Sequence, residues 1–214
     1  ILLYNAGFPT EGKIDTIKKD ENYDTAKFAQ IIGDFYDQAA QAAEQGGAKL
    51  SVVTTADTIQ TGSDAKSGQT LDNLSKAGID YVGAGRNKAE AAKPLVYDLN
   101  GLKVAYVNAT RAELTLYTPD AGENSPGVLS CYDPAQFEKV IAQAKQQADL
   151  VVCCVHWGIE YSYELEQVQK DTARAYIDAG ADVIVGTHSH CLQGIEYYKG
   201  APIFYNLGNF WFNE

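Results

Sequence analysis

The stretch VVCCVHWGIEY, residues 151–161, decides how the rest of the sequence is interpreted. An apolar run of strand-forming residues stops abruptly at the tripeptide His-Trp-Gly, which begins at His156. A second apolar run, ADVIVGTHSH at residues 181–190, also stops on histidine, at His188 and His190. The chain has 3 histidines, so every imidazole follows the end of a predicted core strand.

Helical and strand patterns alternate along most of the chain, which predicts an α/β fold with a mainly parallel sheet covered on both faces. The Asn-Gly pair at residues 100–101 predicts a tight hairpin that adds antiparallel strands, so the sheet is mixed. No linker composition interrupts the pattern, and we expect a single domain over residues 1–214. The predicted helices are 24–46, 68–78, 134–148 and 163–179, and the predicted strands are 48–57, 79–85, 148–158 and 181–190. Hairpins are predicted at 93–110 and 194–210, and a long polar connection is predicted at 112–132.

The composition excludes several classes of partner. The net charge is −11 and no Lys/Arg cluster stands out, which disfavours nucleic acid and anionic membranes as partners. No apolar run reaches the ~18 residues that a membrane span needs. The 4 cysteines match no zinc motif, and adjacent Cys153 and Cys154 point to opposite faces of a strand, so we interpret them as small buried thiols.

The strand-end histidines suggest a ligand site. In α/β sheets, ligands bind beyond the carboxyl ends of the strands. Alternate residues of an extended chain point the same way, so His188 and His190 are expected to converge, and His156 joins them if its strand is a neighbour. Three imidazoles with an open position form a catalytic metal site. The alternative is that they are loop histidines with local hydrogen bonds.

Three segments together resemble a known family: VHWGIEY, GTHSHCLQGIEYYKGAPIFYNLGNF and AGIDYVGAGRNKAEAAKPLVYDLNGLKVAYVN. They are similar to the bacterial capsule-synthesis (CapA/PgsA-like, poly-γ-glutamate synthesis) proteins. The resemblance implies a calcineurin-like metallophosphatase fold, in which two mixed sheets pack face to face between helices in four αββα layers. It also implies a metal centre at the strand ends, with His156, His188 and His190 as ligands.

Two further motifs that the resemblance implies are not matched. No Gly-Asp follows a leading strand, so the chain is expected to begin after that motif. Where the family has Asn-Asn-His, this chain reads TTADTIQTG, with Asp57 near the asparagines and no histidine. Without both motifs a two-metal phosphoesterase is hard to build. Asp57 is the candidate to replace one ligand or to act in catalysis, because a carboxylate suits divalent cations.

Other candidates carry two interpretations each. Glu160 is either a catalytic-site carboxylate that orients an imidazole or an exposed loop acid. Arg86, after a strand end, either binds a substrate carboxylate or phosphate or anchors its loop. Asn209 either contributes to substrate binding and to holding the ligand loops or is ordinary turn chemistry. Trp157 is expected to pack beneath the site.

The resemblance implies two possible functions. The first is a metal-dependent, phosphoesterase-like hydrolase in envelope-polymer metabolism, using Mn, Zn or Fe on a phosphorylated or amide substrate. The second is a catalytically degenerate relative that binds an envelope polymer or an assembly partner, including other capsule-synthesis proteins. Both interpretations imply an extracellular or cell-surface location.

Overall fold

The computed structural model describes residues 52–54, 64–76, 80–111 and 119–209. In chain order the elements are β2 (Val52–Thr54), α3 (Asp64–Lys76), β3 (Asp80–Val82), β4 (Ala84–Gly85), α4 (Lys88–Ala91), β5 (Leu95–Leu99), β6 (Leu102–Thr110), β7 (Gly127–Val128), α5 (Pro134–Lys145), β8 (Leu150–Trp157), α6 (Gln167–Asp178), β9 (Val183–His188), β10 (Ile195–Tyr198) and β11 (Ala201–Phe204).

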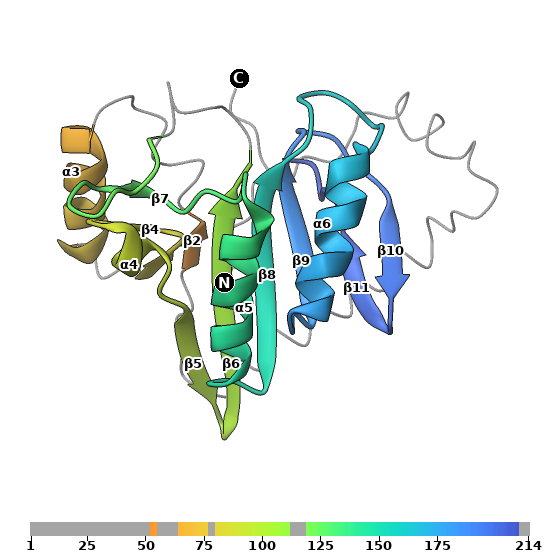
Figure 1. The fold of residues 1–214 in the computed structure, drawn as a ribbon, viewed down its shortest axis with the longest axis horizontal. Coiled ribbons are helices and arrows are strands. Elements are labelled where there is room, and N and C mark those ends of the chain that lie inside the picture. Colours follow the sequence, from red (N-terminus) through yellow and green to blue (C-terminus); the bar gives the residue numbers. More distant parts are fainter. Residues whose placement is uncertain (1–51, 55–63, 77–79, 112–118, 210–214) are drawn as a thin grey trace.

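The main feature is a 6-stranded mixed sheet in the order β10-β11-β9-β8-β6-β5 (Figure 1). Its central strands β6, β8, β9 and β11 are parallel, and an antiparallel hairpin closes each edge. Two smaller sheets, β2-β3 and β4-β7, have 2 strands each. The prediction of an α/β fold with a mixed, mainly parallel sheet is therefore confirmed.

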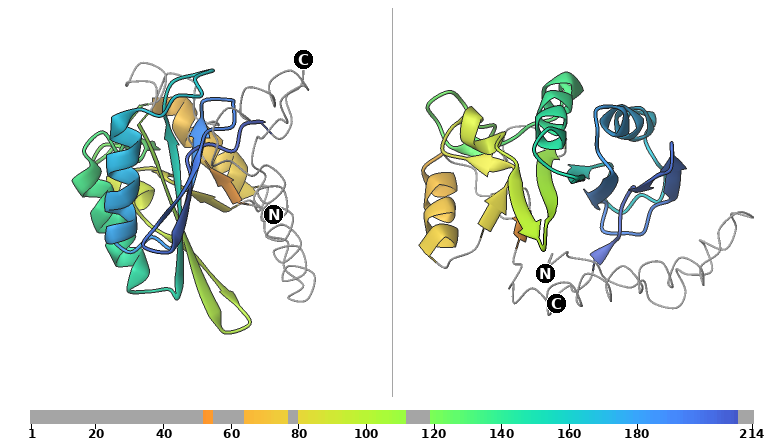
Figure 2. Two further views of the ribbon diagram at one scale, coloured as in Figure 1. Left: turned by 90° about the vertical axis from the view of Figure 1, so that its right-hand side faces the viewer. Right: turned by 90° about the horizontal axis from the view of Figure 1, so that it is seen from below.

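The main core lies between this sheet and the helices α5 and α6, which cover the same face (Figure 2). Trp157 is completely buried there, and its indole N–H donates to the Tyr205 carbonyl oxygen at 2.9 Å. Tyr176 of α6 packs almost parallel to the Trp157 ring. The prediction that Trp157 is a packing residue is confirmed.

The opposite face of the same strands carries a second, smaller apolar cluster around Cys154 and Val185. Cys153 belongs to the helix-covered core, so the two adjacent thiols do point to opposite faces, as predicted. All 4 cysteines are buried. Burial raises the pKa of Cys131 and of Cys154 to about 12 each, which keeps these thiols protonated and unreactive at neutral pH.

The turn at Asn100-Gly101 and the end of α6 at Gly180 have the backbone conformations that their residues predict. Asn100 and Gly101 both have positive φ, 56° and 91°, as a two-residue type I′ hairpin requires. Gly180 ends α6 with φ of 117°, and the Ala181 N–H reaches back to the Tyr176 carbonyl in a Schellman arrangement.

Several predicted boundaries were wrong by a few residues. Helix α6 begins at Gln167 rather than at residue 163, because Glu166 and Gln169 form a capping box that fixes the first turn. The strand predicted at 79–85 breaks into β3 and β4 at Gly83, where φ is 84°. The connection predicted at 112–132 contains β7, which pairs with β4. The helix predicted at 24–46 lies outside the described residues.

Candidate functional site at the carboxyl edge of the sheet

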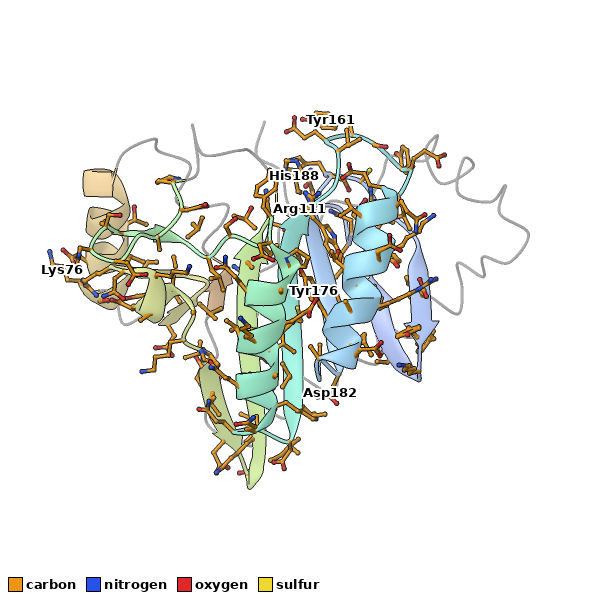
Figure 3. All side chains as sticks on the ribbon, in the orientation of Figure 1. Lys76, Arg111, Tyr161, Tyr176, Asp182 and His188 are labelled. Carbon is orange, nitrogen blue, oxygen red and sulfur yellow. The ribbon has the colours of Figure 1, made fainter. Side chains whose placement is uncertain are left out.

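The three histidines lie at one edge of the main sheet. Strands β6, β8 and β9 are parallel neighbours, so their carboxyl ends meet at this edge. His156 is the penultimate residue of β8, His188 is the last residue of β9, and His190 follows in the next loop. Figure 3 shows His188 and Arg111 at this end of the sheet, with Asp182 at the opposite end.

The tertiary structure brings the three imidazole rings together. The ring centroids of His156 and His188 are 4.6 Å apart, and those of His188 and His190 are 6.5 Å apart. The first contact follows from the register, since His156 is paired with Thr187 and the chain continues directly to His188. The sheet therefore places all three imidazoles in one cluster, which we call the histidine cluster.

Thr187 fixes the orientation of the His156 ring. The Nδ1 atom of His156 lies 2.9 Å from the Thr187 hydroxyl, and that hydroxyl donates to the Val155 carbonyl oxygen at 3.4 Å. The contact orients the His156 ring, and the His156 tautomer decides which of the two groups donates. His156 is only 5% exposed, so this orientation is tightly held.

His190 is held by groups on three sides. Its Nδ1 donates to the Asn209 side-chain oxygen at 2.6 Å, and its Nε2 lies 3.7 Å from a Glu160 carboxylate oxygen. The Tyr161 ring stacks on the imidazole at a centroid distance of 5.8 Å. Asn209 therefore contacts a histidine of the cluster directly, and Glu160 is a neighbour of His190 rather than of His156.

The backbone of this loop is unusual. His188 has φ of 100° and His190 has φ of 56°, in a region that side chains other than glycine seldom adopt. The Tyr161 N–H donates to the Ser189 carbonyl oxygen at 2.8 Å, which ties the loop after β8 to the loop after β9. Such a conformation costs free energy and persists only where the surroundings enforce it.

A buried pair of glutamines also links the loop after β8 to the loop after β9. Gln169 is completely buried, and its side-chain N–H donates to the Gln193 side-chain oxygen at 3.1 Å. Gln193 in turn donates to the Ser162 carbonyl oxygen at 2.9 Å. Gly158 leaves room for Gln169, because a Cβ there would lie 3.0 Å from its side-chain nitrogen. We call Gln169 and Gln193 the glutamine bridge; sequence analysis missed it, because nothing in the sequence links two glutamines on separate elements.

Arg111 was also missed, although the reasoning that found the histidines applies to it. It directly follows β6, and its backbone N–H donates to the His156 carbonyl oxygen at 2.8 Å. Its guanidinium lies over the Tyr132 ring, 5.1 Å from the centroid. The Arg111 side chain thus lies on the α5/α6 face of the sheet, while His156, like Cys154, points to the opposite face.

Arg86 lies away from the histidine cluster, between α3 and α4. Arg86 bonds to an Asp72 carboxylate oxygen at 2.6 Å and to a Glu90 carboxylate oxygen at 3.1 Å, joining α3 to α4. Asp57 lies outside the described residues. Among the described residues, no group of three or more His, Cys, Asp or Glu side chains has an arrangement that could by itself hold a metal ion. In the same part of the chain, no helix combines the length and apolar character needed to cross a membrane.

The fold and this edge define an α/β protein with clustered imidazoles at the carboxyl ends of parallel strands. The chain belongs to the family described as bacterial capsule synthesis protein PGA_cap, which matches residues 16–214. The family predicted from the three sequence segments is therefore confirmed.

Curated relatives agree with this family. The chain is 43% identical over 146 residues to the PGA biosynthesis protein CapA of Bacillus subtilis (strain 168), covering 68% of this chain and 38% of that protein. It is 37% identical over 183 residues to the capsule biosynthesis protein CapA of Bacillus anthracis, covering 83% and 43% respectively. A probable polyglutamine synthesis accessory protein of Mycobacterium tuberculosis is 32% identical over 148 residues, covering 65% and 39%. The matched part of the chain thus spans about two fifths of each relative's length.

Proposed function

We propose that this chain is a metal-dependent, phosphoesterase-like hydrolase that acts in the metabolism of a capsule or poly-γ-glutamate-type envelope polymer. The observation that carries the proposal is the contact between the His156 and His188 rings, whose centroids are 4.6 Å apart, with Nδ1 of His156 anchored on Thr187. Two imidazoles from separate strands, one with its ring oriented by a buried hydroxyl, are typical of metal ligands.

The donor chemistry fits a borderline divalent cation such as Mn, Zn or Fe. Neutral imidazole suits these ions, and the hydrogen bonds at Nδ1 of His156 and of His190 direct Nε2 of each ring as the ligating atom. We propose His156, His188 and His190 as the ligands and Asp57 as a further ligand or catalytic carboxylate. A bound cation would supply Lewis acidity and lower the pKa of a water molecule.

The surrounding residues position the ligands and the substrate. Glu160, at 3.7 Å from Nε2 of His190, would stabilise a positive charge on that ring or exchange a proton with the substrate. Asn209 orients His190 and therefore borders the histidine cluster. Arg86 remains a proposed substrate contact only if a ligand displaces its carboxylate partners; its present ion pairs support the role of a loop anchor.

The proposal includes the calcineurin-like arrangement of two mixed sheets packed face to face. What supports it is the apolar cluster around Cys154 and Val185 on the sheet face opposite α5 and α6. The relatives' names, a PGA biosynthesis protein and a capsule biosynthesis protein, support an envelope polymer as substrate and a cell-surface location. The name of the mycobacterial relative supports an accessory role beside other synthesis proteins.

Metal binding is tested by elemental analysis after dialysis against Mn²⁺, Zn²⁺ or Fe²⁺ in turn. We expect stoichiometric metal in the wild type, and loss of most of it in His156→Ala and His188→Ala. Glu160→Gln should keep the metal but lose hydrolysis of phosphodiester and γ-glutamyl test substrates. Glu164→Gln, an acid-to-amide change on the same loop, is the matched control.

The alternative function, a relative that binds a polymer or an assembly partner without turnover, predicts a different pattern. In that case wild-type protein takes up no stoichiometric metal, and the histidine variants bind the polymer as the wild type does. That pattern would overturn the hydrolase proposal.

A further inference from the structure

Backbone strain concentrates at the candidate site. In the described part of the chain, five residues other than glycine have positive φ. Asn100 and Lys199 each precede a glycine in a tight hairpin, where this conformation is ordinary. The other three are His188, His190 and Tyr161, and the φ of Tyr161 is 57°. Such a conformation costs free energy, so Tyr161 is held in place by its contacts at the site.

The Tyr161 side chain is exposed and yet fixed. At 67%, it is the most exposed large apolar side chain in the described part of the chain. Its ring stacks on the His190 imidazole at a centroid distance of 5.8 Å and an interplanar angle of 28°. Its backbone N–H donates to the Ser189 carbonyl oxygen at 2.8 Å. Because one face of the ring lies against His190, the exposed area belongs to the other face and to the ring edge.

Two further exposed apolar side chains, Ile159 and Tyr163, flank Tyr161 in the same loop. Figure 3 shows Tyr161 at the same end of the sheet as His188. Burying these side chains would favour folding, so their exposure is a cost to the isolated protein. Exposed apolar side chains that gather beside a candidate site mark a ligand-binding surface. The open face of the Tyr161 ring is therefore the part of this loop that a substrate would contact.

The polar neighbour of Tyr161 is a carboxylate. The Glu160 side chain is 53% exposed, and one of its carboxylate oxygens lies 3.7 Å from Nε2 of His190. A ligand on Tyr161 therefore meets a flat apolar surface with a negatively charged acceptor beside it. A sugar ring matches both, because one face carries C–H groups and the rim carries hydroxyl donors. A γ-linked glutamyl unit does not, because Glu160 and the net charge of −11 repel its own carboxylate.

We propose that Tyr161 is a stacking platform for a sugar ring, and that the substrate is a phosphorylated saccharide whose phosphate reacts at the histidine cluster. The identity of the reacting group rests on the proposed function, and Tyr161 narrows the envelope polymer to a saccharide. In the hydrolysis, water adds to phosphorus, the ester P–O bond breaks, and a water proton ends on the released sugar hydroxyl. Tyr161 takes no part in these bond changes and acts on specificity.

The test compares two ligands that differ only in the sugar. The methylene phosphonate analogue of glucose 1-phosphate cannot be hydrolysed, and methylphosphonate lacks the sugar. Both are titrated calorimetrically into Zn²⁺-loaded protein. We expect Tyr161→Ala to weaken the sugar phosphonate about tenfold, the effect of losing one aromatic contact, and to leave methylphosphonate unchanged. Tyr161→Trp keeps an aromatic face and should bind the sugar phosphonate as the wild type does.

Tyr197→Ala is the matched control, because Tyr197 is 60% exposed on the edge strand β10. It should bind both phosphonates as the wild type does, and thermal melting of each variant checks that it folds. A second measurement needs no metal. Saturation-transfer NMR with cellotetraose in EDTA should show binding to the wild type and to Tyr197→Ala, and no binding to Tyr161→Ala.

Two outcomes would overturn the platform. The first is an equal loss of both phosphonates in Tyr161→Ala, which would mean that the ring only supports His190. The second is binding of a γ-linked glutamate decamer that depends on Tyr161 while cellotetraose does not bind, which would indicate an acidic polymer. If the wild type takes up no metal but its binding of cellotetraose still depends on Tyr161, the hydrolase proposal fails and the platform stands.

Discussion

The imidazole rings of His156 and His188 lie 4.6 Å apart, although they come from separate strands. The contact exists because β8 and β9 are parallel neighbours whose register places His156 beside Thr187. This contact is the centre of the candidate site, and the Thr187 hydroxyl supports it.

Thr187→Val removes the hydroxyl that orients the His156 ring. The side chain keeps its shape, but Nδ1 of His156 loses its hydrogen-bond partner at 2.9 Å. We expect metal affinity to fall roughly tenfold or more, as for other groups that orient a ligating histidine. The measurement is competition with a fluorescent chelator. Thr172→Val, a buried threonine that bonds only within α6, is the control and should leave metal affinity unchanged.

Gln193→Leu breaks the glutamine bridge. It leaves the buried Gln169 side-chain N–H without its acceptor, and it removes one of the two donors to the Ser162 carbonyl oxygen, the other being the Cys191 thiol. We expect a loss of about 2–3 kcal/mol in the free energy of unfolding, measured with urea. Because the two glutamines act as a unit, Gln169→Leu/Gln193→Leu should cost less than the sum of the single variants. Strict additivity would contradict the bridge.

Gly186→Ala tests the packing beneath the site. A Cβ at this position would lie 1.9 Å from the Tyr205 carbonyl oxygen and 2.5 Å from the Trp157 indole nitrogen. Neither atom can move without disturbing β9 and β11, so we expect destabilisation above about 3 kcal/mol or failure to fold. Gly200→Ala provides a contrast, because its Cβ would meet no atom within 4 Å; its cost should come only from its φ of 87°. Similar melting temperatures for both variants would contradict this account.

Glu196→Gln should change stability in a pH-dependent way. Burial alone would raise the pKa of Glu196, but hydrogen bonds from Arg174 and Tyr205 hold it below its ordinary value of 4.5. A lowered pKa in the folded state means that the carboxylate stabilises the protein above pH 4.5. That stabilisation is lost as the pH falls through the folded-state pKa. The wild type should therefore be more stable than Glu196→Gln at pH 7, and the difference should shrink in acid. A pH-independent difference in urea denaturation would count against it.

Much of the fold could be predicted because the signals are local. The Asn100-Gly101 pair predicts the β5-β6 hairpin, since both residues tolerate positive φ. The start of α6 was wrong although its signal is also local, because the capping box of Glu166 and Gln169 marks the first turn of the helix. In the site, the three histidines were found because ligands of α/β sheets bind beyond the carboxyl ends of the strands. The same reasoning applied to β6 would have found Arg111.

The sequence by itself determined which residue types stand at the ends of the strands, because continuous apolar runs and the polar or turn residues after them mark where each strand stops. It also determined the family, through segments that the matching relatives share. Only the tertiary structure decided which strand ends are neighbours. Parallel strand order places β6, β8 and β9 side by side, and it thereby joins His156 to Thr187, Arg111 to His156 and Gln169 to Gln193. Such contacts arise between distant parts of the chain, so no local pattern encodes them.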